Sequence, residues 1–184
     1  MKQLFKDRYV LALDPSGSYK EGQGTTGWVL LDQETGKILK FGTIKAVDYS
    51  CQFKYWDAHV QLIDQFAGYH PTVVIEDYML YGTEARAQIN SRLETPQLLG
   101  ILKYETYKRG MLIYIQTAAQ VKVRWTDEIL AYKGYLRKEG IHYSINGVPV
   151  VSHTKDAIRH AIHFMTYNSN YRKGDSERYE TRRY

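Results

Sequence analysis

The amino-acid sequence predicts an α/β domain with a mixed five-stranded sheet, three antiparallel strands followed by two parallel ones, flanked by helices. The apolar pattern gives the order strand, strand, strand, helix, strand, helix, strand, helix, and strands joined through a helix run parallel in one sheet. The length of 184 residues and the hydrophobic content of 43% are those of one globular domain. We expect this domain over residues 1–167 and a polar, flexible tail over residues 168–184.

The first three strands are joined by a glycine-rich loop and a tight turn. Residues Tyr9–Leu13 form an apolar run that stops at Asp14, and the proline after Asp14 favours extended backbone there. The runs Trp28–Leu31 and Ile38–Phe41 flank the turn-forming residues Asp32–Gly36, which predicts a β-hairpin. The chain therefore begins with three consecutive antiparallel strands.

The centre of the chain alternates between helix and strand. Apolar residues recur at intervals of three and four over Phe53–Ala67, which is the period of an amphipathic helix, and Gly68 ends it. The β-branched run Thr72–Ile75 is typical of a buried strand, and it ends at Glu76. This strand therefore finishes on a carboxylate, as the first one does.

The second half of the chain continues the alternation. Thr95 and Pro96 predict the start of a helix that closes before Gly110, with threonine as its N-cap and proline at its first position. The further expected elements are a strand at Met111–Ile115, a helix over Thr126–Lys138, a loop or small hairpin over residues 141–150 around Asn146-Gly147, and a last helix over Thr154–Tyr167.

Composition and charge narrow the classes of function. The chain carries 25 Lys and Arg against 20 Asp and Glu, a formal net charge of +5, which favours an anionic partner. Cys51 is the only cysteine, so we expect no internal disulfide, no cysteine-based zinc site and a reducing environment. No stretch approaches the roughly 18 apolar residues of a membrane span, and the N-terminus has no apolar signal core. We therefore expect a cytoplasmic protein with no membrane partner.

Two carboxylates follow buried strands. If the strands before Asp14 and Glu76 are parallel neighbours, both side chains lie at the carboxyl edge, where open α/β sheets place ligands. Like charges at short range are costly without a counter-ion, and hard divalent cations are the usual ligands of carboxylate oxygens. The sequence therefore predicts a Mg²⁺ site at this edge.

The last predicted helix supplies further candidate ligands. At 100° per residue, His153, Asp156, His160 and His163 lie within about 80° of one another. Apolar residues occupy roughly the opposite side, so the helix has a core face and a polar stripe. A metal site beneath the polar stripe would explain why the helix has polar ligands on one side and apolar residues on the other. The alternatives are an ordinary exposed helix face and a zinc site built from His153, Asp156 and His160.

Three short motifs resemble the signature blocks of RuvC-type Holliday junction resolvases, which belong to the RNase H-like superfamily. They are Leu11-Ala-Leu-Asp-Pro15 with Thr26-Gly-Trp28, then Val73-Val-Ile-Glu76, then His153-Thr-Lys-Asp156-Ala157. The likeness spans residues 9–166. A longer stretch between Ala12 and Trp28 and an enlarged segment at residues 126–150 resemble the diverged, phage-encoded members, which would act in the cytoplasm of a bacterial host cell.

The resemblance implies an RNase H-like fold and an activity. It implies cleavage of phosphodiester bonds at four-way (Holliday) and other branched DNA junctions, with two Mg²⁺ ions per active site or Mn²⁺ in their place. The implied metal ligands are Asp14, Glu76 and Asp156, with His153 as a fourth ligand or as the group that orients water. It also implies a homodimer formed by the helix after the fourth strand, with Leu98, Gly100, Ile101 and Leu102 as candidate contacts.

Basic side chains are the candidate DNA contacts. The segment Gln120-Val-Lys122 resembles the basic segment that follows the fifth strand in this family, and Arg124 comes directly after it. Arg86 and Arg92 follow Glu76. Phosphate contacts carry no sequence information, which suits recognition of junction shape. Solvated helix faces are the alternative interpretation of these residues.

Other functions stay open at the level of sequence. The segment Gly22-Gln-Gly24-Thr-Thr-Gly27 matches a dinucleotide-site glycine pattern but opens onto a strand, so we expect no small-molecule cofactor. An RNase H or a transposase-like nuclease is the nearest alternative. An actin- or sugar-kinase-like phosphotransferase, which also begins with a strand, an aspartate and a Gly/Thr-rich hairpin, and a metal-free DNA-binding module are the alternatives from other classes.

Overall fold

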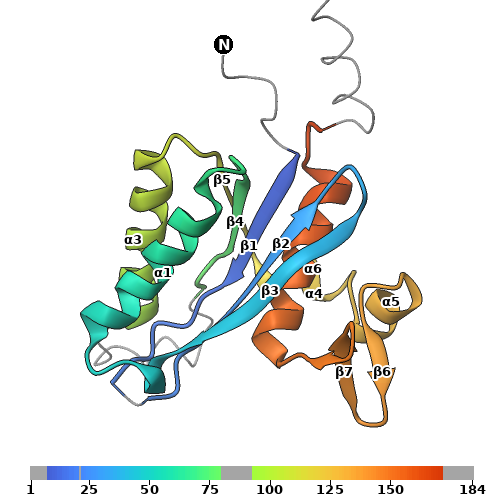
Figure 1. Ribbon diagram of the computed structural model, residues 1–184, viewed down its shortest axis with the longest axis horizontal. Helices are drawn as coiled ribbons and strands as arrows, with labels where there is room; N and C mark the ends of the chain where they lie inside the picture. Colours follow the sequence, from blue (N-terminus) through green and yellow to red (C-terminus); the bar gives the residue numbers. More distant parts are fainter. Residues whose placement is uncertain (1–7, 21, 80–92, 172–184) are drawn as a thin grey trace, which may run out of the picture.

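The computed structural model describes residues 8–20, 22–79 and 93–171, and its centre is a five-stranded sheet with strand order β3-β2-β1-β4-β5 (Figure 1). The strands are β1 (Tyr9–Asp14), β2 (Thr25–Asp32), β3 (Lys37–Lys45), β4 (Thr72–Glu76) and β5 (Ile113–Gln116). Strands β1, β2 and β3 pair antiparallel, whereas β4 pairs parallel with both β1 and β5. The predicted mixed sheet is therefore confirmed.

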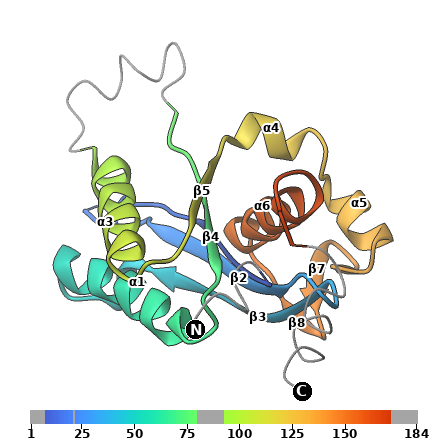
Figure 2. The same ribbon diagram turned by 90° about the horizontal axis from the view of Figure 1, so that it is seen from above.

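Helices cover both faces of this sheet, as Figure 2 shows. Helices α1 (Gln52–Ala67) and α3 (Glu94–Lys108) lie on one face, and α6 (Ser152–Tyr167) lies on the other with the short helix α4 (Ala118–Lys122). A 3-10 turn, η1 (Ala46–Asp48), leads from β3 into α1. The three long helices agree with the predicted ones to within a few residues. The predicted start of α3 is wrong in detail, because Leu93 is its N-cap and Thr95 and Pro96 lie inside its first turn.

The central strand β1 divides the core into two layers. Val10 and Ala12 pack with residues of α6, whereas Leu11 and Leu13 pack with residues of α1 and α3. All four side chains are fully buried. A strand covered on both faces needs an apolar residue at every position, which explains its unbroken apolar sequence.

The pairing register aligns three polar residues at one edge of the sheet. Asp14 at the end of β1 lies opposite Gly27 of β2, and Glu76 at the end of β4 lies opposite Gln116 of β5. Because β1, β4 and β5 are parallel neighbours, Asp14, Glu76 and Gln116 end adjacent strands at the same carboxyl edge.

Residues 126–150 form a small additional unit beside α6 (Figure 1). Its elements are α5 (Asp127–Tyr132) and a three-stranded antiparallel sheet of β6 (Arg137–Glu139), β7 (His142–Ile145) and β8 (Val148–Pro149). Asn146 and Gly147 join β7 to β8 with φ values of 51° and 79°, as a two-residue hairpin turn requires. The predicted hairpin around these two residues is confirmed.

The helix predicted over Thr126–Lys138 is wrong beyond Tyr132. Gly134 follows with a φ of 81°, a left-handed conformation that ends the helix and that glycine adopts without steric cost. Leu130 and Leu136 are both buried, but Leu136 reaches the core from the turn after the helix. The spacing of these two leucines therefore does not arise from one continuous helix.

Two further details differ from the predictions. Strand β5 begins at Ile113, and Met111 precedes it. Helix α4 was not predicted from its apolar pattern. It is nevertheless specified by a capping box, because the Thr117 side chain accepts from the Gln120 backbone N–H and the Gln120 side chain accepts from the Thr117 backbone N–H.

The C-terminal residues after α6 are described as far as Tyr171, whose hydroxyl contacts the Glu34 carboxylate. The remainder of the predicted tail, residues 172–184, lies outside the described residues. Within the described ranges, no helix combines the length and apolar character needed to cross a lipid bilayer.

Candidate metal centre

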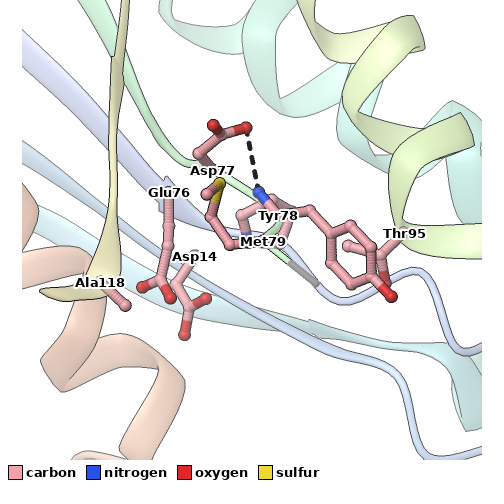
Figure 3. A pocket seen from close by; sticks show the side chains of 8 residues that line it. Asp14, Glu76, Asp77, Tyr78, Met79, Thr95 and Ala118 are labelled. Atoms are coloured by element: carbon pink, nitrogen blue, oxygen red, sulfur yellow. Dashed lines mark hydrogen bonds between the residues drawn. The ribbon is translucent and has the colours of Figure 1, made fainter. Parts of the chain in front are cut away.

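Three carboxylates from three elements converge at the carboxyl edge of the sheet. Asp14 ends β1, Glu76 ends β4, and Asp156 lies near the start of α6. One oxygen of each carboxylate lies within 4.8 Å of an oxygen of each of the others. Figure 3 shows the Asp14 and Glu76 side chains directed at the same space, with Ala118 beside them. The structure thus brings together the three acidic residues singled out from the sequence.

A cavity of about 160 Å³ opens beside this cluster. Asp14 and Glu76 line one part of it, and Tyr78 and Thr95 line another. Asp77 follows Glu76 in the chain, but its carboxylate points away from Asp14 and accepts a hydrogen bond from the Tyr78 backbone N–H at 3.0 Å (Figure 3). Of the two consecutive acidic residues, only Glu76 therefore joins the cluster.

Close packing of α6 against β2 places Asp156 in the cluster. A Cβ atom added to Gly27 would lie 2.1 Å from the carbonyl carbon of His153, so only glycine permits the first turn of α6 to lie this close. The Thr154 hydroxyl donates to the Gly42 carbonyl at 3.2 Å, which ties the same turn to β3. The helix is thus fixed against the strands beside Asp14.

Asp14 pairs directly with His153. The distance from His153 Nδ1 to Asp14 Oδ2 is 2.7 Å, and Asp14 is 7% exposed. Burial raises the pKa of the Asp14 carboxyl, the hydrogen bond from His153 lowers it in part, and the charges of Glu76 and Asp156 raise it further. The hydrogen bond to Asp14 raises the pKa of His153 above its usual value. A cation at this place would relieve the repulsion among the carboxylates.

Lys122 at the end of α4 already brings a positive charge to the cluster. Its Nζ lies 3.1 Å from Asp156 Oδ2 and 3.6 Å from Glu76 Oε1. Desolvation lowers the pKa of Lys122, but attraction to Glu76 and Asp156 outweighs it and the pKa is raised. Predicted as a DNA contact, Lys122 thus lies against the carboxylates themselves.

The donor set fits a divalent metal ion. All three candidate ligands offer carboxylate oxygens, which hard cations such as Mg²⁺ and Mn²⁺ prefer. The ammonium of Lys122 between Glu76 and Asp156 marks the place where positive charge is favourable. The acidic cluster is therefore compatible with binding of a divalent metal.

The histidines of the predicted polar stripe have three different environments. His153 contacts Asp14, whereas His160 is fully buried and its Nε2 lies 2.8 Å from Glu76 Oε2. His163 lies farther along α6 beside Tyr167, with a centroid separation of 4.9 Å. The ring nitrogens of His153 and His160 thus face different carboxylates. His160 is not on an exposed helix face, as the simpler interpretation of the stripe would have it.

The other candidate DNA contacts are only partly described. The Arg124 guanidinium stacks over the Tyr167 ring, 5.0 Å from its centroid, and lines a second cavity of about 530 Å³ with His163. Arg86 and Arg92 lie outside the described residues. Of the four predicted residues, the structure therefore places Lys122 in the acidic cluster and Arg124 on a neighbouring surface.

Three polar residues close to the cluster were not singled out from the sequence. Gln116 contacts His160, and Arg159 contacts both Asp156 and Asp127. Gln116 ends a strand beside Glu76, so the strand-end pattern that predicts the two carboxylates also points to this residue. Asp127 belongs to the segment after β5, and its contact with α6 has no signature in the sequence.

Comparison with solved structures identifies the class of fold as RNase H-like, with the RuvC arrangement of sheet and helices. A Thermus thermophilus RuvC in complex with Holliday junction substrate matches with a TM-score of 0.59 and 17% identity, over 86% of this chain and 93% of that one. A second Thermus thermophilus RuvC structure matches with a TM-score of 0.56 and 18% identity, over 86% and 94%. No protein-family model matches the chain, and no curated protein matches its sequence. The RuvC-like fold predicted from three short motifs is confirmed.

Proposed function

We propose that this protein is a metal-dependent endonuclease that cleaves phosphodiester bonds at four-way and other branched DNA junctions in the cytoplasm, through a domain spanning residues 1–167. The observation that carries the proposal is the convergence of Asp14, Glu76 and Asp156 at the carboxyl edge of a RuvC-like sheet. A Thermus thermophilus protein of this fold binds a Holliday junction substrate, which supports branched DNA as the substrate class.

In this proposal Asp14, Glu76 and Asp156 hold Mg²⁺, or Mn²⁺ in its place, at two positions. Two bound ions would activate a water as the nucleophile and stabilise the leaving oxygen of the phosphodiester. His153, whose Nδ1 lies 2.7 Å from Asp14, would be a fourth ligand or would orient the attacking water. With its side chain 41% exposed, His153 can reach a substrate that lies over the cluster.

The DNA surface in this proposal surrounds the cluster. Lys122 pairs with two of the carboxylates, and once metal ions compensate these charges its ammonium can contact a phosphate. Arg124 lies on the neighbouring surface beside Tyr167, where it can contact the backbone of the same strand. Arg86 and Arg92 stay predicted contacts. The net charge of +5 favours this interaction with an anionic polymer.

We also propose that two copies associate through the exposed face of α3, since paired cuts across a junction require two sites. Leu98 and Leu102 are buried in the core, so the contact face is narrower than predicted. Gly100, Tyr104 and Tyr107 share one side of the helix. The two tyrosines are 61% and 74% exposed, and open space lies next to Gly100. Exposed tyrosines beside a glycine suit close packing of a second helix.

The test is cleavage of a labelled four-way DNA junction and of a matched linear duplex in Mg²⁺, Mn²⁺ or EDTA. We expect paired, metal-dependent cuts near the branch point with the wild type. Glu76→Gln should abolish cleavage and keep junction binding, because it removes a charged ligand at nearly constant shape. Lys122→Gln and Arg124→Gln should weaken junction binding, whereas Lys54→Gln, on the opposite face of the sheet, serves as the control.

Three results would contradict the proposal. A preference for RNA/DNA hybrid over the junction would favour an RNase H or transposase-like enzyme. Turnover of ATP without DNA cleavage would favour a phosphotransferase of the actin or sugar-kinase type. Junction binding with no cleavage in either metal would indicate a metal-free binding module.

A further inference from the structure

Each carboxylate of the cluster has its own hydrogen-bond partner on α6. His153 contacts Asp14, Arg159 contacts Asp156, and His160 contacts Glu76. We propose that Arg159 and His160 are positioning residues, which hold one oxygen of Asp156 and of Glu76 so that the other oxygen is presented to the metal. This inference rests on the proposed function, since it assigns roles toward the metal of that site.

The geometry at His160 fixes one oxygen of Glu76. His160 is fully buried, and its Nε2 lies 2.8 Å from Glu76 Oε2. An ionised carboxylate can only accept hydrogen bonds, so Nε2 carries the proton and donates. The other oxygen, Oε1, lies on the side of Lys122, 3.6 Å from its Nζ. His160 therefore orients the carboxylate without occupying the oxygen that faces Lys122.

Gln116 holds the His160 ring from the other side. Its Oε1 lies 2.9 Å from His160 Nδ1, and the side chain is almost fully buried at the end of β5. Its Nε2 has no hydrogen-bond partner among the described residues. With the proton on Nε2, the Nδ1 of a neutral ring is an acceptor, and rotation of the amide by half a turn lets Gln116 Nε2 donate to it. A chain of two side chains, Gln116 and His160, thus reaches Glu76 from the neighbouring strand.

Arg159 fixes one oxygen of Asp156 in the same manner. Its Nη1 donates to Asp156 Oδ1, its Nη2 donates to Asp127 Oδ1, and its Nε donates to the Trp125 carbonyl at 2.7 Å. All three guanidinium nitrogens are engaged, and the side chain is 13% exposed. The other oxygen of Asp156, Oδ2, lies 3.1 Å from Lys122 Nζ. Each of the two carboxylates therefore has one oxygen held by a residue of α6 and the other directed at Lys122.

One carboxylate partner of Arg159, Asp127, belongs to the enlarged segment over residues 126–150. Asp127 is the first residue of α5, and it also pairs with Lys155 of α6. The Thr126 side chain caps α5 by accepting from the Ile129 backbone N–H, which fixes the start of this helix. The segment thus supports the metal centre through Asp127 and Arg159, although none of its side chains belongs to the acidic cluster.

The test is titration of the full-length protein with Mn²⁺ alone, followed by calorimetry. His160→Leu and Arg159→Met should weaken Mn²⁺ affinity by roughly 10- to 100-fold, the range found when a side chain that supports a metal ligand is removed. His160→Gln, which keeps an N–H donor near the position of Nε2, should bind more tightly than His160→Leu. Asp127→Asn should also weaken affinity, because it loosens Arg159.

Controls separate positioning from folding. Arg109→Met removes another paired arginine, which contacts Asp64 and Glu105 at the opposite end of the domain, and should leave Mn²⁺ affinity unchanged. Thermal unfolding in EDTA measures how much each variant loses in stability without metal.

Wild-type affinity in both His160→Leu and Arg159→Met would overturn the inference and leave the proposed function intact. Equally weak binding by His160→Gln and His160→Leu would overturn the role of the hydrogen bond. Failure of the wild type to bind Mn²⁺ would instead overturn the proposed metal site.

Discussion

At the scale of single residues, a buried histidine of α1 supports the loop that follows Asp14. His59 Nδ1 donates to the Tyr55 carbonyl at 2.7 Å, and its Nε2 accepts from the Thr26 hydroxyl at 2.8 Å. Thr26 in turn accepts from the Ser16 backbone N–H at 3.3 Å. This arrangement requires a neutral ring, and burial lowers the pKa of His59 from 6.5 to about 4. The loop therefore depends on a histidine that stays uncharged.

A pH dependence of stability follows from this group. Between pH 6.5 and about 4 the unfolded chain takes up a proton at His59 and the folded chain does not, so stability is lost as the pH falls through this window. The gap corresponds to about 3 kcal/mol. We expect His59→Gln to reduce the loss in free energy of unfolding between pH 7 and pH 4, measured by urea denaturation. The exposed His142 gives the control, since His142→Gln should leave the loss as in wild type; an unchanged loss in His59→Gln would contradict the prediction.

The acidic residues of the candidate site could be predicted, but not the residues behind them. Asp14 and Glu76 each follow a buried apolar run, so strand ends alone place them at one edge. The contacts of His160 with Glu76 and of Arg159 with Asp127 join residues 84 and 32 positions apart, and side-chain pairs at such separations have no local pattern. The spacing of His160 on α6 indicated the correct face of the helix and no more.

At the scale of elements, the seating of α6 on β2 depends on Gly27. A side chain there would lie 2.1 to 2.3 Å from the backbone of His153 and Thr154, well inside the distance that any Cβ tolerates. The helix would have to move away from the sheet. Because α6 carries Asp156 together with the partners of Asp14 and Glu76, a displaced helix would disturb the whole cluster.

We therefore expect Gly27→Ala to destabilise the protein by about 1–3 kcal/mol, the range for forced overpacking, and to weaken Mn²⁺ binding as well. The measurements are urea unfolding and the same Mn²⁺ titration. Gly68→Ala at the end of α1 is the matched control, since its added methyl group meets open space and its φ of −63° suits alanine. Equal stabilities for the two variants would show that α6 can shift without cost.

The elements that could be predicted are those whose period is set by packing on the sheet. Helices α1 and α6 each pack one apolar face on the sheet, and β1 and β4 are buried on both faces, so their apolar patterns follow from geometry. The segment after Thr126 has no single period, because its buried residues Leu130 and Leu136 join the core from a short helix and from the turn after it. The left-handed conformation of Gly134 ends the helix, and the spacing of apolar residues gives no indication of it.

At the scale of the whole molecule, the proposed dimer makes a direct prediction. The wild type should sediment at about twice the chain mass of 21.5 kDa at micromolar concentration. Tyr104→Glu combined with Tyr107→Glu should give the monomer, because two charges on the face of α3 oppose association. Tyr132→Glu on α5, where the tyrosine is 91% exposed, is the control and should remain a dimer. A monomeric wild type would overturn the proposed interface.

The register of β4 against β1 also determines which changes of chain length the molecule can accept. Val73 and Ile75 face one layer of the core, Val74 faces the other, and Glu76 follows at the strand end while Asp77 points elsewhere (Figure 3). Deleting one residue within β4 would exchange the two core faces and bring a differently directed carboxylate to the cluster. Insertions and deletions should therefore be confined to connections such as the loop after Asp14 and residues 126–150. Related sequences can therefore differ in length in these connections, while the strands that carry the acidic residues keep a constant length.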